Sequence, residues 1–435
     1  MRIVYTDDQS FEAEMSRIHN RGTVVDPLIS EAVNKIVRDV AERGDAALFE
    51  YTKKFDGIAL DGTSVEVSAE EKASALQNIS TADRDLLDLA ARRIEAFHRK
   101  QTVNSWFTVE DDGVELGQLI RPLERVGIYA PGGLAAYPST VLMGAIPAKV
   151  AGVGEIILTT PSKVKEINPL IIAAANIGGV HRIFKVGGAQ AIAALAYGTA
   201  SITAVDKIVG PGNVYVATAK KMVYGIVGID MIAGPSEIVI ISDGTVRASV
   251  VAADLLSQAE HDEMASALLL TPVKEFALDV AAEVDSQLKD LRKSAIASRS
   301  IEDYGAIIVT KDMDEALSIA NRFAPEHLEL MVRRPRELLG KVKNAGALFL
   351  GGSSPEVLGD YIAGPNHILP TGGTARFSSP LGVYDFVKRT SIISFSDASL
   401  RKHGESVKRF TEIEGLDAHG KSITARLTRP SSKIS

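Results

Sequence analysis

The sequence predicts an α/β protein built from two Rossmann-like domains, each with a parallel β-sheet. Short β-rich runs alternate with stretches of helical periodicity, first at residues 125–133, 155–160, 182–188 and 205–212. The same alternation then restarts, with buried-type runs at residues 237–243, 267–272, 305–310 and 346–352. A strand, a helix and a second strand repeated in this way indicate a parallel sheet that is covered by helices on both faces.

The rest of the chain supplies the remaining parts of the predicted architecture. Residues 25–105 carry apolar side chains at helical spacing, whereas residues 1–24 are polar and mixed, which is typical of an arm. Residues 382–435 lose the β periodicity and contain a run of helical character. We therefore predict an N-terminal arm at 1–24, a discontinuous first α/β domain at 25–130 and 237–381, a second Rossmann-like domain at 131–236, and a C-terminal helical extension at 382–435.

The composition is that of a globular protein and excludes several functions. Of 435 residues, 46% are hydrophobic and 24% are charged, and the formal net charge is −7, so no basic excess is present to neutralise nucleic-acid phosphates. No apolar run is long enough to span a bilayer, and the start MRIVYTDDQSFEAEM lacks the pattern of a signal peptide. We therefore expect a cytoplasmic protein with neither nucleic-acid nor membrane partners.

The chain contains no cysteine, which removes thiolate metal ligands and thiol nucleophiles. A metal site must then use His, Asp, Glu or Gln side chains. Gln258 and His261 are three residues apart at the end of a predicted helix, so both leave from one face. Asp360 and His367 lie in a Gly- and Pro-rich loop, and His419 lies in a polar turn. Such a set would suit zinc or manganese, although each residue taken singly is more often structural.

The stretch NRFAPEHLEL sets Glu326 directly beside His327. Pro325 with an acid behind it favours the first turn of a helix, because proline tolerates that position and the acid suits the helix dipole. On this interpretation, the start of a helix directs both side chains into one cavity.

Two glycine turns between a strand and a helix are candidates for nucleotide binding. Gly210-Pro-Gly212-Asn213 lacks the third glycine of the dinucleotide fingerprint, and a simple strand-closing turn explains it about as well. Gly187-Gly188-Ala189-Gln190 could also receive phosphates at a helix N-terminus.

In these motifs the chain resembles the histidinol dehydrogenase family. The blocks that carry the resemblance occur in the family's order, from RVGIYAPGGLAAYPSTVLMGAIPAKVAGV through KVGGAQAIAALAYGT, GPGNVYV, IAGPSEI, SQAEH and PEHLEL to GDYIAGPNHILPTGG and LDAHGKS. The resemblance runs from about residue 28 to beyond residue 420. It implies an aldehyde-dehydrogenase-like fold and the oxidation of L-histidinol to L-histidine with two NAD, through bound L-histidinal, as the last step of histidine biosynthesis.

The resemblance also implies a role for particular residues. Gln258, His261, Asp360 and His419 become ligands of one zinc ion per subunit, with manganese as an alternative metal. Glu326 and His327 become the catalytic pair. The implied NAD contacts are Tyr129, Gln190 and Asn213, and the implied substrate contacts are Ser236, His367 and Glu414 together with His327 and the metal ligands. The family is an intertwined homodimer, which implies that Glu414 and His419 come from the partner subunit.

The chemistry of a four-electron oxidation fits this assignment. Two hydride transfers need a base for the hydroxyl protons, and an imidazole such as that of His327 is suited to this near neutral pH. Without cysteine, the aldehyde must be hydrated, and Glu326 is the candidate to activate that water. Alternatives left open are a related zinc and NAD dehydrogenase of another small alcohol such as a sulfonated diol, a zinc hydrolase, and a non-catalytic nucleotide-binding module.

Overall fold

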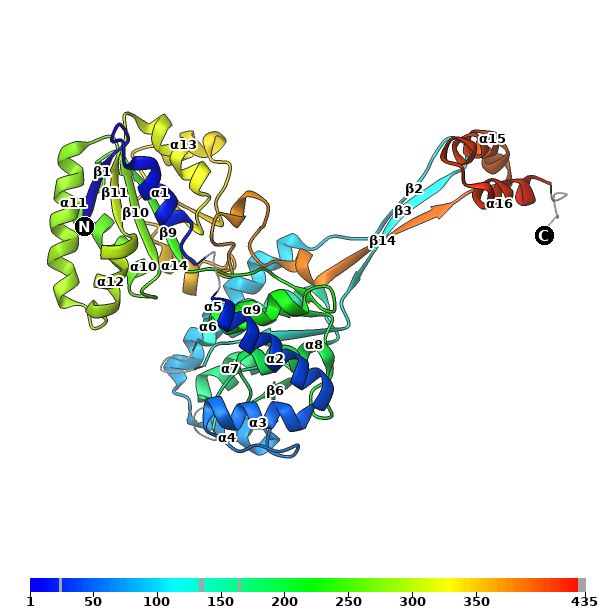
Figure 1. Ribbon diagram of the computed structural model, residues 1–435, viewed down its shortest axis with the longest axis horizontal. Coiled ribbons are helices and arrows are strands. Elements are labelled where there is room, and N and C mark those ends of the chain that lie inside the picture. Colours follow the sequence, from blue (N-terminus) through cyan, green and yellow to red (C-terminus); the bar gives the residue numbers. More distant parts are fainter. Residues whose placement is uncertain (23–25, 133–136, 163–165, 429–435) are drawn as a thin grey trace. The chain divides into compact units, whose positions relative to one another are not determined.

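The computed structural model describes residues 1–22, 26–132, 137–162 and 166–428, and these residues form two compact units. The main unit comprises Met1–Gln101 and Leu123–Phe386. The C-terminal unit comprises Thr102–Pro122 and the residues from Val387 onward. Both units are drawn in Figure 1.

The first sheet of the main unit is six-stranded and entirely parallel. Its order is β1 (Arg2–Tyr5), β11 (Ala306–Val309), β10 (Ser266–Thr271), β9 (Glu237–Ser242), β12 (His327–Met331) and β13 (Ala347–Leu350). Along β9, Ile238 and Ile240 pack into one core, whereas Val239 and Ile241 pack into another. Both faces are therefore covered, as expected of a parallel sheet.

Helices on each face of this sheet supply the rest of the two cores. One core includes side chains of α10 (Ala248–Ala259), α11 (Lys274–Gln287) and α12 (Ser294–Tyr304). The other includes side chains of α1 (Phe11–His19) and α13 (Met313–Phe323). A short helix, α14 (Glu356–Tyr361), follows β13.

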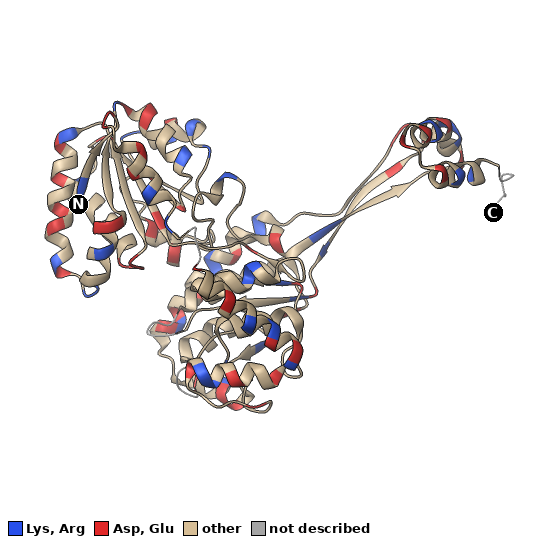
Figure 2. Cartoon of the chain, in the orientation of Figure 1, with Lys and Arg blue, Asp and Glu red and all other residues tan. Residues whose placement is uncertain are grey.

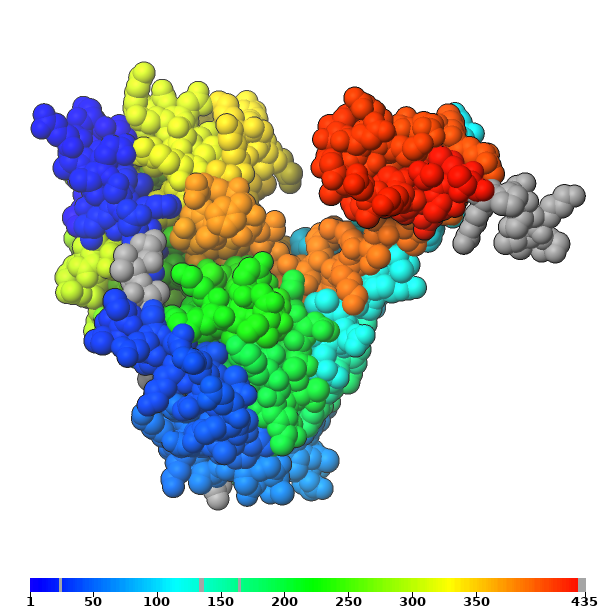
Figure 3. Space-filling model, turned by 45° about the vertical axis from the view of Figure 1, so that its right-hand side comes forward, coloured from blue at the N-terminus to red at the C-terminus, as the bar shows by residue number. Residues whose placement is uncertain are grey.

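The prediction of an N-terminal arm at residues 1–24 is wrong for most of that segment. β1 pairs in parallel with β11, and Phe11, Met15 and Ile18 of α1 are buried in the core. In the space-filling view, the dark-blue N-terminal residues lie against the yellow and yellow-green residues of this part of the chain (Figure 3). The apolar stripe of α1 is short, which is why the surrounding polar residues concealed it in the sequence.

The second sheet of the main unit is five-stranded and also parallel. Its order is β6 (Arg182–Phe184), β5 (Glu155–Thr159), β4 (Arg125–Tyr129), β7 (Lys207–Val209) and β8 (Gly228–Ile229). One core contains side chains of α4 (Ala69–Asn78), α5 (Thr81–His98), α6 (Pro138–Ala151) and α7 (Pro169–Gly178). The other contains side chains of α2 (Pro27–Arg43), α3 (Asp45–Asp56), α8 (Gly188–Tyr197) and α9 (Val214–Val223).

The α/β fold class with two parallel sheets is confirmed, but the sheets divide the chain differently from the predicted domain boundaries. β4 and the helices of residues 27–98 belong with the five-stranded sheet, not with residues 237–381. An amphipathic helix shows that one face is buried but not which sheet buries it. The predicted split of 25–130 from 131–236 fails for this reason.

The C-terminal unit contains an antiparallel sheet of order β14 (Val387–Ser394), β3 (Glu115–Pro122) and β2 (Trp106–Val109). Two helices, α15 (Asp397–Glu414) and α16 (Asp417–Leu427), follow β14. The predicted helical extension therefore also contains a strand, which pairs with residues far away in the sequence.

The main unit also contains short 3₁₀ segments, at Arg99–Gln101, Leu288–Asp290, Pro335–Lys341, Thr374–Arg376 and Val383–Phe386.

The surface carries interspersed charges. Acidic and basic residues are both present on the helices of each unit in the charge-coloured view, with a run of acidic residues along α11 (Figure 2). Within the described ranges, no helix is both long and apolar enough to cross a membrane.

Candidate active site

Glu326 and His327 lie where a helix ends and a strand begins. α13 ends at Phe323, and its C-cap Ala324 has φ of 50°, in the left-handed region. Pro325 follows, and His327 is the first residue of β12. The predicted helix start is therefore wrong, because the left-handed residue stops the helix before the proline and the apolar HLELM segment is buried between β9 and β13.

The imidazole of His327 is oriented by two oxygen atoms. Its Nδ1 lies 3.1 Å from the Glu237 carbonyl oxygen and 3.1 Å from Gln258 Oε1. Since both are acceptors, Nδ1 carries the hydrogen and donates, which leaves the lone pair of the neutral ring on Nε2. Nε2 lies 4.0 Å from Asp360 Oδ1. Burial lowers the pKa of His327 to about 3, so the ring is neutral and free to accept a proton.

The Glu326 carboxylate is held by the neighbouring strand. The backbone N–H of Glu237 donates to Glu326 Oε2 at 2.9 Å, and the backbone N–H of Glu326 donates to Glu237 Oε2 at 3.4 Å. Glu326 Oε2 lies 3.9 Å from His327 Nδ1, so the two predicted catalytic residues share one buried region. Burial raises the pKa of Glu326 well above its ordinary value.

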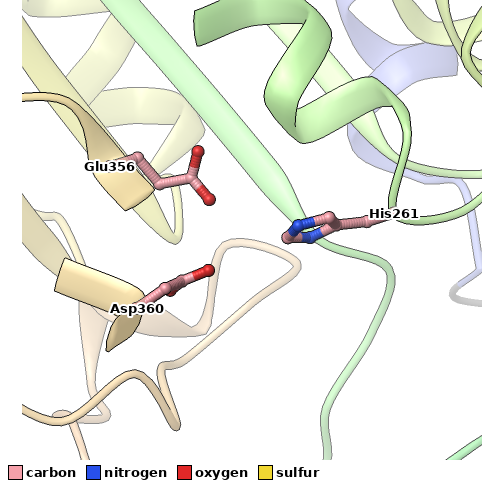
Figure 4. A group of neighbouring side chains, drawn as sticks. All are labelled: His261, Glu356 and Asp360. Atoms are coloured by element: carbon pink, nitrogen blue, oxygen red, sulfur yellow. The ribbon is translucent and has the colours of Figure 1, made fainter. Parts of the chain in front are cut away.

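A candidate metal site lies beside this pair. His261, which follows α10, and Glu356 and Asp360 of α14 offer ligand atoms that all lie within 4.8 Å of one another. The three side chains point toward a common space (Figure 4). Glu356 and Asp360 are four residues apart, so they leave one face of the helix.

The chemistry of these groups fits a divalent cation. Glu356 is 1% exposed, and its Oε1 has no hydrogen-bond partner among the described residues. Burial raises the pKa of Glu356 to about 8 and that of Asp360 to about 6, so the positive charge near these two groups does not offset the cost of burying them as carboxylates. One imidazole and two carboxylates are ligands that zinc accepts, and such a cation would supply that charge.

The structure brings together only part of the predicted ligand set. His261 and Asp360 meet, while Gln258 hydrogen-bonds His327 and its Nε2 lies 3.4 Å from His261 Nδ1. His419 lies in α16 and Glu414 ends α15, both exposed and both in the C-terminal unit. Glu356 was missed by sequence reasoning, although its spacing of four from Asp360 was a usable signal.

Two predicted substrate contacts lie near the same residues. His367 Nδ1 donates to the Asp360 carbonyl oxygen at 2.8 Å, and its Nε2 lies 3.4 Å from Thr140 Oγ1. Burial lowers the pKa of His367 to about 4, so this ring is also neutral. Ser236 is half-buried and immediately precedes β9 and Glu237.

The predicted NAD residues lie at the carboxyl ends of strands in the five-stranded sheet. Tyr129 ends β4, and its hydroxyl accepts a hydrogen bond from Gly188 N–H at 3.2 Å. Gln190 is buried in the first turn of α8. Asn213 caps α9, because its Oδ1 accepts from the N–H groups of Tyr215 and Val216. This edge is where parallel α/β sheets bind ligands.

The family model described as histidinol dehydrogenase matches residues 19–427. The chain belongs to the histidinol dehydrogenase family, whose members are oxidoreductases of histidine biosynthesis.

Individual relatives agree with this assignment over nearly the full chain. Histidinol dehydrogenase of Syntrophotalea carbinolica is 54% identical over 427 residues, which are 98% of this chain and 99% of the relative. That of Geobacter metallireducens is 52% identical over 98% of each chain. The crystal structure of histidinol dehydrogenase from Elizabethkingia anophelis superposes with a TM-score of 0.92, at 36% identity and 98% coverage of each chain.

Proposed function

We propose that this protein oxidises L-histidinol to L-histidine in a zinc-dependent reaction that reduces two NAD and passes through bound L-histidinal. The observation that carries the proposal is the neutral His327, whose Nε2 lies 4.0 Å from Asp360 of the candidate metal cluster. A base is thereby placed beside the groups that would hold the substrate. As an NAD-linked biosynthetic enzyme, the protein is expected in the cytoplasm.

The proposed metal centre uses His261, Asp360 and Glu356 from the main unit, with His419 and Gln258 as the further ligands that the family resemblance implies. Bound zinc would hold the nitrogen atoms of histidinol and offset the buried carboxylate charges. Ser236, His367 and Glu414 are proposed to complete the substrate contacts.

His327 is proposed to remove the protons in both oxidations. In the first step the alcohol O–H proton moves to His327 Nε2 as the carbinol hydride moves to NAD⁺, which leaves the aldehyde and NADH. The hydrogen bonds from Nδ1 to Glu237 and Gln258 favour this base, because both acceptors stabilise the imidazolium that forms.

Glu326 is proposed to act between the two oxidations. Once ionised, its carboxylate takes a proton from water as the water oxygen bonds to the aldehyde carbon. The imidazolium of His327 gives the proton from the first step to the carbonyl oxygen, which yields the hydrate and restores the neutral base. The second hydride then leaves the hydrate for another NAD⁺, and His327 accepts a hydroxyl proton. Tyr129, Gln190 and Asn213 are proposed to contact the nucleotide in both steps.

We further propose a homodimer in which Glu414 and His419 reach the partner's site. Val407, Phe410 and Ile413 form a stripe along α15 at a spacing of three, and they are 39%, 65% and 67% exposed. Other exposed apolar side chains of the C-terminal unit lie on or directly after its strands, namely Trp106, Phe107, Val109, Ile393 and Phe395. Exposed large apolar side chains in such numbers are typical of an interface, and a second copy is the proposed occupant.

The proposed reaction is tested by the yield of NADH per L-histidinol consumed, before and after chelation. Two NADH per substrate, lost on chelation and restored by zinc, is the expected result. One NADH, or activity only with another small alcohol such as a sulfonated diol, would show a different dehydrogenase. No NADH from the metal-loaded protein would refute the proposal.

A further inference from the structure

We propose that Arg21 is a positioning residue for the aldehyde step: acting through the buried Glu237, it fixes the orientation of the Glu326 carboxylate. This inference rests on the proposed role of Glu326. Arg21 lies outside the predicted catalytic blocks, in a segment that the sequence presented as a polar arm.

The guanidinium of Arg21 is fully engaged inside the protein. Its Nε donates to the Met264 carbonyl oxygen at 2.7 Å and its Nη1 to the Ile18 carbonyl oxygen at 2.7 Å. Its Nη2 lies 3.2 Å from both the Ser236 carbonyl oxygen and Glu237 Oε1. The side chain is 1% exposed. The planar guanidinium therefore ties the backbone at Ile18, Met264 and Ser236 to the Glu237 carboxylate. A lysine ammonium lacks this fixed planar set of donors and could not make the same contacts.

Glu237 links this guanidinium to Glu326. One of its carboxylate oxygens, Oε1, receives the Arg21 hydrogen bond, and the other, Oε2, accepts from the backbone N–H of Glu326. In return, the backbone N–H of Glu237 donates to Glu326 Oε2. Each carboxylate is thus bound by the other residue's backbone, and the Glu237 side chain is 0% exposed.

The arrangement depends on the charge of Arg21. Two carboxylates held this close in a buried region repel each other when both are ionised. Arg21 is the cation in contact with Glu237, so it offsets that repulsion and holds Glu237 where its backbone N–H meets Glu326. Without Arg21, Glu237 would carry an uncompensated buried charge, and its displacement would move Glu326 as well.

The proposal makes a prediction that a merely structural ion pair does not make. Glu326 is proposed to act on the aldehyde and not on the alcohol. Loss of Arg21 should therefore slow the oxidation of supplied L-histidinal much more than the first hydride transfer from L-histidinol. A general loss of folding or of metal would slow both.

The experiment measures both half-reactions in single-turnover assays on zinc-loaded Arg21→Lys, Arg21→Gln and Glu237→Gln proteins, with Glu326→Gln as the reference. We expect the aldehyde step to fall on the order of 10- to 100-fold in Arg21→Gln and Glu237→Gln. The alcohol step should fall severalfold less, because it depends on His327, whose Nδ1 contacts the backbone carbonyl of Glu237 and not its side chain. Arg21→Lys retains the positive charge but not the planar guanidinium. Its rate for the aldehyde step should therefore lie between those of the wild-type and Arg21→Gln proteins.

A matched control is Arg182→Gln, which removes a two-nitrogen contact with Glu66 from the five-stranded sheet. It should alter thermal stability without altering the ratio of the two half-reactions. If Arg21→Gln fails to fold, the ratio of the two half-reaction rates is compared in Arg21→Lys and Glu237→Gln instead.

The outcomes separate this inference from the proposed function. If Glu326→Gln selectively slows the aldehyde step but the Arg21 and Glu237 variants do not, the positioning role is refuted and the proposed function stands. If Glu326→Gln itself slows both steps equally or neither, the proposed role of Glu326 fails, and this inference fails with it.

Discussion

The side chain of His327 shows how one environment selects both the protonation state and the reactive atom of an imidazole. Burial keeps the ring neutral, and two acceptors at Nδ1 place the free lone pair at Nε2. A histidine in water titrates near pH 6.5, and no fixed acceptor holds the hydrogen on one ring nitrogen. The position of Gln258 on α10 and the carbonyl of Glu237 on β9 are therefore as important to the site as the histidine itself.

Replacement of His327 by Asn removes the proton acceptor while retaining a polar side chain. We expect both oxidation steps to slow by about 10²- to 10⁴-fold, the range of general-base catalysis. Single-turnover NADH formation from L-histidinol and from L-histidinal measures each step. Equal zinc content in the variant is the control, and a normal rate in either step would contradict a shared base.

A substitution of Glu356 tests whether this residue is one of the metal ligands. Since its unpaired Oε1 belongs to the cluster with His261 and Asp360, Glu356→Gln should weaken zinc binding by roughly 10- to 100-fold. Competition with a chromophoric chelator measures this affinity. Asp254→Asn is the matched control, because Asp254 is a nearby acid whose pKa is also raised by burial but which is not in the cluster. Unchanged affinity in Glu356→Gln would exclude Glu356 as a ligand.

At the scale of elements, the site is assembled at the ends of strands and helices. β9 and β12 are parallel neighbours, with His327 in register with Ile238, and this pairing brings Glu326 beside Glu237. α14 turns Glu356 and Asp360 toward the end of α10. The predicted NAD residues are placed by the same principle: Tyr129 ends β4, and Gln190 and Asn213 follow the carboxyl ends of β6 and β7.

An ion pair joins two elements of the C-terminal unit and gives that unit a specific pH dependence. Asp112, which precedes β3, accepts a hydrogen bond from His403 Nε2 of α15 at 2.6 Å and lies 3.2 Å from Lys402 Nζ. The bonds to His403 and then Lys402 lower the pKa of Asp112 to about 2. The folded state thus favours the ionised carboxylate more than the unfolded state does. The resulting stability is present above about pH 4 and is lost as the pH falls to about 2.

We therefore expect Asp112→Asn to lower the unfolding temperature of this unit at pH 5 and to lower it progressively less toward pH 2. The single tryptophan of the chain, Trp106, lies in β2 of the same unit, so its fluorescence reports this transition. Lys408→Gln, which removes an exposed pair with Glu405, should show no such convergence. A stability difference that is constant from pH 5 to pH 2 would exclude the Asp112 carboxylate as its source.

For the whole molecule, the proposed dimer divides each active site between two chains. Co-expression of His327→Asn and His419→Ala chains with different tags allows purification of the mixed dimer. If His419 acts across the dimer, one site in that dimer combines both changes and the other is wild type, so roughly half of wild-type activity should return. Each variant expressed alone should be inactive. An inactive mixed dimer would place His419 and His327 of one chain in the same site.

Much of the fold was determined by the sequence in a readable form. The buried runs that became β4 to β7 and β9 to β11 are continuous and largely apolar, and a Gly, Pro or Asp follows each of them within three residues. Such runs are typical of central strands in a parallel sheet, because both faces of those strands are covered. The motif blocks likewise pointed to His261, Asp360, Glu326 and His327, which lie close together in the structure, and their roles stay predictions.

Only the tertiary structure decided how the segments combine. β1, β12 and β14 are defined by partners distant in the chain, and the helices of residues 27–98 are assigned to the five-stranded sheet by packing alone. The same holds for Glu356, Glu237 and Arg21, whose contacts join residues up to 243 positions apart. Local propensity and periodicity show that a face is buried or a chain extended. They cannot show which distant residues a buried face packs against or an extended segment pairs with, because the packing of the whole core determines those partners.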